Sequence, residues 1–271
     1  MHSVLALTQI HDSMLDLVGA KNSKTFDNHW HQALCLMQRN LTQPITSWQK
    51  DALWIATALI SVGSLVTINA ASPLEAWPIR PPSPSDLSWL KLCDGKRLIT
   101  QITNPVRDGG DFQPVAKEFN MTLSRIENVV YGVHSFDRLP LDFYDLLELS
   151  NGPLNNPYYA SAVALADILR LELSEKTFLP HLAFVSILDS KFRDLLSQRD
   201  ERAMLIILYW YAKICDRRLW WMWKQAWTEG LAISEYLKRA WKREPKLITL
   251  LTWPRTTLVI ASRAGIMPIK S

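Results

Sequence analysis

Glycine is scarce in this chain, at nine of its 271 residues. The glycine-containing motifs GxGxxG, GxxxxGKS/T and GxSxG are all missing, which argues against a nucleotide-dependent enzyme. Alternation of apolar and polar residues, the pattern of a β-strand, is missing as well. Helix-favouring residues such as Leu, Ala, Met, Lys, Arg and Glu are frequent instead. The sequence therefore predicts an all-α fold, arranged as a single multi-helix domain.

Cysteine is also rare, and Cys35, Cys93 and Cys215 lie far apart. An odd, widely spaced set provides neither a disulfide framework nor a four-cysteine zinc site. Because each cysteine has apolar neighbours, we expect buried, reduced thiols in a cytoplasmic or nuclear protein. The first fifteen residues lack the charged start and long apolar run of a secretory signal.

One segment, residues 52–71, has no charged residue over a length that could cross a bilayer. Thr57, Ser61, Ser64, Thr67 and Asn69 recur along it, however, and aromatic or basic anchors do not mark both of its ends. We therefore predict a buried helix here and no membrane span.

Metal-binding patterns are weak. His29 and His31 are two residues apart, so on a helix their side chains point away from each other. A second group, Asp142, Asp145 and Glu148, could hold Mg²⁺, but its spacing differs from the adjacent aspartates of terpene synthases. A solvated helix face explains these carboxylates better. No metal and no cofactor is predicted, and no catalytic triad is evident.

Charge is unevenly distributed. From Arg202 onward the chain carries thirteen Lys and Arg against four Asp and Glu, a net charge of +9, whereas the first 201 residues carry −5. A basic region can indicate an acidic partner such as nucleic acid. These charges are dispersed, which favours a cationic solvent-facing coat over a nucleic-acid site.

Apolar periodicity and turn residues divide the chain. Helices are predicted over residues 1–18, 27–41, 46–69, 140–150, 157–173, 178–198, 201–217, 219–240 and 245–252. The prolines between residues 73 and 84 predict an extended connector, followed by a short helix capped at Ser85 or Asp86. Asn104-Pro105 and Gly109-Gly110 predict a loop over residues 104–120, and residues 151–157 predict a turn.

Aromatic residues concentrate between residues 204 and 227, which contain five of the twelve tryptophans. Burying one aromatic side chain removes roughly 150–250 Å² from water, so a core explains this cluster and so does a pocket for a large apolar molecule. On a helix, Trp220, Trp223 and Trp227 would form one stripe, while Tyr209, Trp210 and Tyr211 fan around the preceding helix. These six residues are the predicted ligand-binding residues.

The segments 51–99, 178–237 and 247–254 resemble the regulatory domain of fungal zinc-cluster transcription factors of the sterol uptake control type. The most distinctive matches are His31-Gln-Ala-Leu, LEAWPIRPPSPSDLSWL, Asn156-Pro157-Tyr158 and Trp220-Trp221. The resemblance covers about residues 1–254. It does not extend to the tail, residues 255–271.

The resemblance implies an all-α, often dimeric domain whose C-terminal helices enclose an apolar cavity, which binds a sterol in the sterol regulators. The six-cysteine DNA-binding cluster of that family is missing from this sequence. We therefore expect no sequence-specific DNA binding by this chain.

Three functions remain open. In the first, the chain binds a sterol-like or terpenoid-like molecule as a regulatory module. In the second, it is a complete secondary-metabolism enzyme, of pericyclase or terpene cyclase type, that uses the same pocket. In the third, it dimerises with a full-length regulator and reduces the activity of that regulator. A snug apolar cavity could fold a polyene for cyclisation without a metal and without a recognisable motif.

Overall fold

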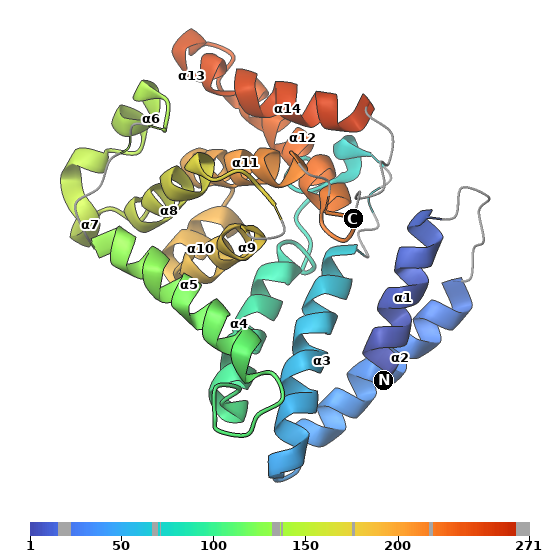
Figure 1. Cartoon of the computed structure of the whole chain (residues 1–271). Helices are drawn as coiled ribbons and strands as arrows, with labels where there is room; N and C mark the ends of the chain where they lie inside the picture. Colours follow the sequence, from blue (N-terminus) through green and yellow to red (C-terminus); the bar gives the residue numbers. More distant parts are fainter. Residues whose placement is uncertain are drawn as a thin grey trace. The chain divides into compact units, whose positions relative to one another are not determined.

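The computed structural model describes residues 1–15, 23–66, 70, 72–131, 136, 138–174, 177–216 and 219–263. These residues contain no β-strand, which confirms the predicted all-α fold. The helices are α1 (His2–Leu15), α2 (Ser23–Leu41), α3 (Ser47–Val66), α4 (Ser88–Thr103), α5 (Gln113–Tyr131), α6 (Leu141–Leu146), α7 (Gly152–Asn155), α8 (Tyr159–Arg170), α9 (Phe178–Ile187), α10 (Ser190–Ser197), α11 (Glu201–Cys215), α12 (Trp223–Ala240), α13 (Pro245–Leu250) and α14 (Thr252–Arg263), with two short 3-10 helices, η1 (Pro73–Glu75) and η2 (Leu149–Asn151). Figure 1 labels these α-helices along the chain.

Backbone contacts divide the chain into two compact units. Unit 1 comprises Met1–Ile68, Leu87–Glu118 and Trp220–Met222, and unit 2 comprises Asn69–Asp86, Phe119–Leu219 and Trp223–Ser271. Within the described part of the chain, no helix is long and apolar enough to cross a membrane. The uncharged segment contributes most of α3, along which Ala52 is the one exposed residue between Asp51 and Val66.

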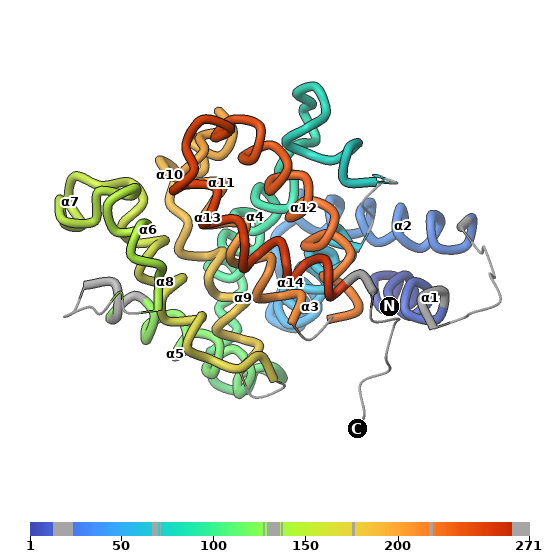
Figure 2. The backbone as a smooth tube through the Cα atoms, turned by 90° about the horizontal axis from the view of Figure 1, so that it is seen from above, coloured from blue at the N-terminus to red at the C-terminus, as the bar shows by residue number. Residues whose placement is uncertain are grey.

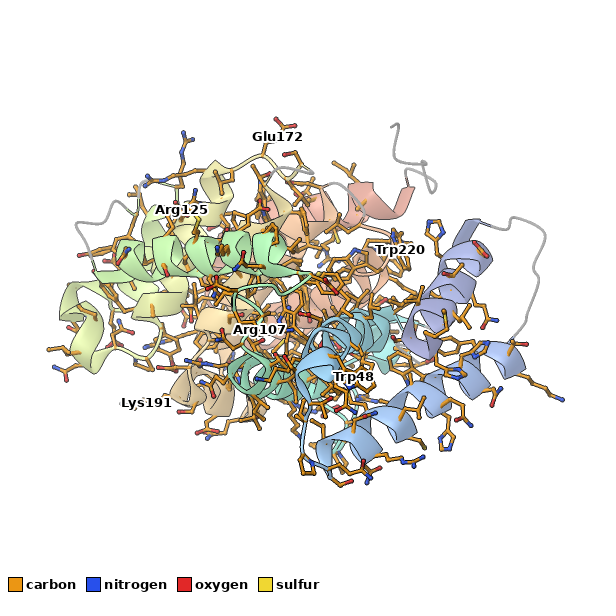
Figure 3. All side chains as sticks on the ribbon, turned by 60° about the horizontal axis from the view of Figure 1, so that its bottom comes forward. Trp48, Arg107, Arg125, Glu172, Lys191 and Trp220 are labelled. Atoms are coloured by element: carbon orange, nitrogen blue, oxygen red, sulfur yellow. The ribbon has the colours of Figure 1, made fainter. Side chains whose placement is uncertain are left out.

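Unit 1 is built on α1, α2, α3 and α4. Its apolar cluster consists of Leu7, Ile10 and Val66, with Phe26, Leu59, Val62, Trp220 and Trp221 packed against them. The Trp220 ring, labelled in Figure 3, makes an edge-to-face contact with the His11 ring on α1, with 4.9 Å between the ring centroids. The Trp220-Trp221 pair therefore has a packing role in unit 1.

A part-buried ion pair fixes the loop that follows α4. Arg107 Nη2 lies 2.6 Å from Asp51 Oδ2 on α3, and the backbone N–H of Asp111 donates to the same oxygen. Arg107 is labelled in Figure 3. This pair attaches residues 104–112 to α3, and α5 begins at Gln113. The loop predicted over residues 104–120 is therefore too long by eight residues.

Unit 2 is organised around α11, which packs against α8, α10, α12 and α14 (Figure 1). Residues Ala203 to Ala212 on this helix are all buried, as its apolar sequence predicts. The indole N–H of Trp241, just after α12, donates to Glu201 at the start of α11, so the two helices are antiparallel. Figure 2 shows α14 beside both of them.

A close approach at Gly230 determines how α12 packs. A Cβ atom at this position would lie 2.9 Å from a methyl carbon of Leu258 on α14 and 3.4 Å from Cβ of Tyr211 on α11. Only glycine leaves room for both neighbours without a shift. The small residue thus brings the polar side chain of Glu229 next to α11.

The proline-rich residues 72–86, here called the strap, are not the predicted extended connector. They contain η1 and further turns, in which the backbone N–H groups of Ile79 and Arg80 donate to the carbonyl of Ala76. Arg80 pairs with Asp86 at 2.5 Å, and Arg199 donates to the carbonyl of Arg80. The ten non-proline residues supply enough N–H groups to form turns, and the strap packs against α12.

Several predicted helix boundaries are wrong. The cap predicted at Ser85 or Asp86 is absent, because the Asp86 carboxylate accepts hydrogen bonds from Ser83 N–H and from Arg80. The helix predicted there as short is α4, which begins at Ser88 and is sixteen residues long. The predicted helix over 178–198 is broken between α9 and α10, where Asp189 caps α10. The turn over 151–157 contains α7. Helices α5 and α14 were not predicted, and α14 occupies the first part of the tail.

Candidate functional site

Trp210 is a fully buried core residue on the α9 side of α11. Its indole N–H donates to the carbonyl of His181 at 2.8 Å, and its ring stacks on Phe184 with 5.5 Å between centroids. The Nδ1 of His181 lies 2.7 Å from the carbonyl of Thr177. Burial lowers the pKa of His181, which keeps this imidazole neutral. Nδ1 therefore carries the proton, and the buried Nε2 has no hydrogen-bond partner.

Tyr209 is also held by protein groups. Its hydroxyl donates to the carbonyl of Leu250 at 2.8 Å, and burial raises its pKa. The ring meets Phe143 edge to face at 4.7 Å and lies 5.1 Å from the ring of Trp253. The ring of Tyr209 and its polar atom are thus in contact with the domain itself, as expected of a core side chain.

Tyr211 points to a different partner, the carboxyl group of Glu229 on α12. The Tyr211 hydroxyl donates to Glu229 Oε2 at 2.5 Å, and Gln225 Nε2 donates to the same oxygen at 3.3 Å. Tyr211, Gln225 and Glu229 are all buried. Gln225 and Glu229 are four residues apart and lie on one face of α12. We call these three residues the carboxyl cluster.

The ionisation of Glu229 is strongly perturbed. Burial, which removes the carboxyl group from water, raises its pKa to about 7. The hydrogen bonds from Tyr211 and Gln225 and the charge of Arg80 oppose this rise, while Asp86 adds to it. Burial and the carboxylate also raise the pKa of Tyr211, so its hydroxyl stays protonated. Near neutral pH the cluster can therefore accept or release one proton at Glu229.

The three tryptophans of the predicted stripe do not lie on one helix. Trp220 lies in a turn before α12 and belongs to unit 1, so the predicted stripe is wrong at its first position. Trp223 and Trp227 do share a face of α12, are half-buried, and have ring centroids 6.3 Å apart. At 100° per residue, this face is nearly opposite the one that carries Gln225 and Glu229.

The six predicted residues are thus distributed over several surroundings. Among them, only Tyr211 belongs to the carboxyl cluster, and its two partners were missed by the sequence reasoning. One feature of the sequence could have indicated the cluster: Glu229 is the single charged residue in the segment from Gln225 to Ser234. A buried carboxyl in an apolar helix is uncommon without a partner, and this partner lies on another helix.

The cluster offers hydrogen-bonding capacity that the domain does not use. Gln225 Oε1 is buried and has no hydrogen-bond partner. The side chains of Tyr211 and Gln225 both donate to Oε2 of Glu229. An unpaired buried acceptor costs about 1–3 kcal/mol. A polar group of a bound molecule would recover this free energy.

Other predicted sites have ordinary surroundings. Among the described residues, no three His, Cys, Asp or Glu side chains gather as metal ligands. Asp142, Asp145 and Glu148 are exposed, in agreement with a solvated face. His29 and His31 have different partners, His2 and Cys35 respectively. The prediction of three buried thiols is wrong for Cys35, which is exposed, and Cys93 is half-buried.

The motif Asn156-Pro157-Tyr158 has a structural role. The Asn156 amide donates to the carbonyls of Leu147 and Glu148, at 2.6 and 2.8 Å, and its oxygen accepts from Tyr158 N–H. These bonds join the end of α6 to the start of α8.

Comparison of the chain with protein-family models, curated proteins and solved structures finds no match.

Proposed function

We propose that unit 2 binds an apolar small molecule whose polar group pairs with the carboxyl cluster of Tyr211, Gln225 and Glu229. The observation that carries this proposal is the unpaired acceptor Gln225 Oε1 beside a buried, titratable carboxyl group. Ligand sites of this kind are mostly apolar, and a few placed polar groups orient the ligand.

The surroundings of the cluster are apolar. Ala226, Ile233 and Leu237, which flank the Glu229 face of α12, are completely buried and apolar, and so is Leu258 on α14. The strap contributes the Arg80–Asp86 pair at the same helix. A molecule that reached this cluster would exchange water for apolar contacts along its length and would need a polar group only at one end.

The proposed role is regulatory, following the resemblance to transcription-factor regulatory domains. A ligand shifts a conformational equilibrium only by binding one state more tightly. A polar group bound at the cluster, where Tyr211 of α11 donates to Glu229 of α12, would favour the state in which these helices are packed together. The strap, which also packs on α12, would respond to the same change.

Replacing Gln225 by leucine tests the site. The wild-type chain is titrated with farnesol and with ergosterol, and binding is followed by tryptophan fluorescence and by the thermal midpoint. We expect saturable binding of at least one of them and a rise in midpoint. Because one hydrogen bond is worth about 1 kcal/mol, Gln225→Leu should weaken the affinity roughly fivefold to tenfold.

Gln198→Leu is the matched control, because Gln198 is an exposed glutamine of the same unit. This variant should bind as the wild type does. If neither molecule binds the wild type, or if Gln225→Leu and Gln198→Leu have equal affinities, the carboxyl cluster is not the site.

A second candidate, an enzyme, is favoured by one observation: Glu229 has a pKa of about 7 inside an apolar region. Cyclisation of an epoxide or a polyene can begin with protonation by a buried carboxylic acid, and an acid is most effective when its pKa is near the working pH. In that role Glu229 would donate its proton and Tyr211 would hold the carboxyl group. Formation of cyclised product from a linear terpenoid, lost in Glu229→Gln, would distinguish the enzyme from the sensor.

A further inference from the structure

When Glu229 is ionised, the carboxyl cluster offers acceptors to a bound molecule. The Tyr211 hydroxyl and an N–H of the Gln225 amide both donate to Glu229 Oε2. Gln225 Oε1 is buried and has no hydrogen-bond partner, and it lies beside the Glu229 carboxylate. The two groups belong to side chains one helical turn apart that already contact each other. A ligand group at this position must donate, and it gains most by donating twice.

The charge at the cluster is also unbalanced. When Glu229 ionises, its hydrogen-bond partners are a neutral phenol and a neutral amide. The nearby cation, Arg80, is paired with Asp86 at 2.5 Å, and the two affect Glu229 in opposite directions. A buried carboxylate without its own cation is costly, and an incoming positive charge would offset this cost.

From these two features we propose that the ligand of unit 2 is a lipophilic amine, an apolar molecule that ends in a protonated primary amine. This inference rests on the proposed function and specifies its chemistry. An ammonium group has three N–H donors and no acceptor, so it can donate to Gln225 Oε1 and to the Glu229 carboxylate and neutralise Glu229 at once. An alcohol has one donor and brings lone pairs, and a carboxylate has no donor and repels Glu229.

Three twelve-carbon probes separate these head groups while keeping the apolar chain constant: dodecylamine, dodecanol and dodecanoate. Each is titrated into the full chain below its micelle concentration at pH 8, with binding followed by calorimetry. We expect dodecylamine to bind at least about tenfold more tightly than dodecanol, since charge-assisted hydrogen bonds are the stronger ones. Dodecanoate should bind most weakly.

The substitution Glu229→Gln keeps the shape of the side chain and removes its charge. It should abolish the preference for the amine while leaving the dodecanol affinity within about twofold of wild type. Glu244→Gln, which removes an exposed carboxylate just after α12, should keep the full preference. Lowering the pH to 5, where Glu229 is protonated, should reduce the preference in the wild type and leave the Glu229→Gln variant unchanged.

Each outcome has one meaning. If none of the three probes binds the wild type saturably, the proposed function itself fails. If all three bind with similar affinity, or if Glu229→Gln retains the preference for the amine, unit 2 is a binding module but the amine assignment is wrong. A preference that Glu244→Gln also loses would assign the effect to surface charge and would overturn the inference.

Discussion

Replacement of Trp210 by alanine is expected to lower the free energy of unfolding by about 3–5 kcal/mol, the range for removing a buried tryptophan from a core. Trp210 is completely buried, stacks on Phe184 and donates to the carbonyl of His181. The substitution removes the ring and also leaves that buried carbonyl without its donor. Because domains are stable by only ~5–15 kcal/mol, this single change should remove a large part of the stability of unit 2.

Urea unfolding followed by circular dichroism measures this effect, with Trp48→Ala as the control. Trp48, at the start of α3, is 77% exposed, so its removal should change the free energy of unfolding by less than about 0.5 kcal/mol (Figure 3). Trp210→Phe keeps an aromatic ring and should fall between the two. Equal midpoints for Trp210→Ala and Trp48→Ala would show that Trp210 does not pack as described.

The second large effect is a dependence of stability on pH that originates at Glu229. Its pKa is about 7 in the folded protein, against 4.5 for an accessible carboxyl group. Between these values the folded state binds more protons than the unfolded state, so stability falls as the pH rises. The slope is about 1.4 kcal/mol per pH unit, and the full difference is roughly 3 kcal/mol above pH 7.

Glu229→Gln isolates this contribution, because glutamine stays neutral at every pH and still accepts from Tyr211. The variant should match the wild type near pH 4.5 and exceed it by up to roughly 3 kcal/mol at pH 8. Denaturation curves at pH 5, 6, 7 and 8 provide the comparison. A difference between the two proteins that does not change with pH would show that Glu229 titrates normally.

The helices that the sequence predicts well are those with a strong apolar period or an apolar surface all round. In α11 every residue from Ala203 to Ala212 is buried, so its existence and central place follow from composition alone. The break between α9 and α10 was harder to predict, because the apolar pattern continues across it. Only the cap at Asp189, whose carboxylate accepts from Phe192 N–H, shows where α10 begins.

Two helices were missed because turn residues were given too much weight. The Gly109-Gly110 signal was extended into α5, although Ala116 and Ile126 on that helix are completely or almost completely buried. The predicted helix over residues 245–252 stops where α14 begins, and no helix was predicted across Pro254. A proline is tolerated in the first turn, where its missing N–H has no helical partner, and here it follows Thr252 and Trp253 at the start of α14.

The candidate site could be predicted only in part. The aromatic residues directed the prediction to α11 and α12, the helices that carry the carboxyl cluster, because their apolar area must be buried somewhere. The sequence does not show that Tyr211 and Glu229 meet, since this contact depends on the antiparallel packing that Gly230 permits. Trp220 was placed on one stripe with Trp223 and Trp227 because the predicted helix began at residue 219. The apolar period does not distinguish that start from the observed start at Trp223.

The most direct test of the central claim is a carbon-13 NMR titration of the glutamate side-chain carboxyl groups, with Glu229→Gln used for assignment. We expect one resonance with a midpoint near pH 7, absent from the variant, and a lower midpoint when dodecylamine is bound, because a neighbouring cation favours the ionised carboxylate. If instead every glutamate titrates in the ordinary range and none responds to the amine, Glu229 is not a buried ligand-binding carboxyl group.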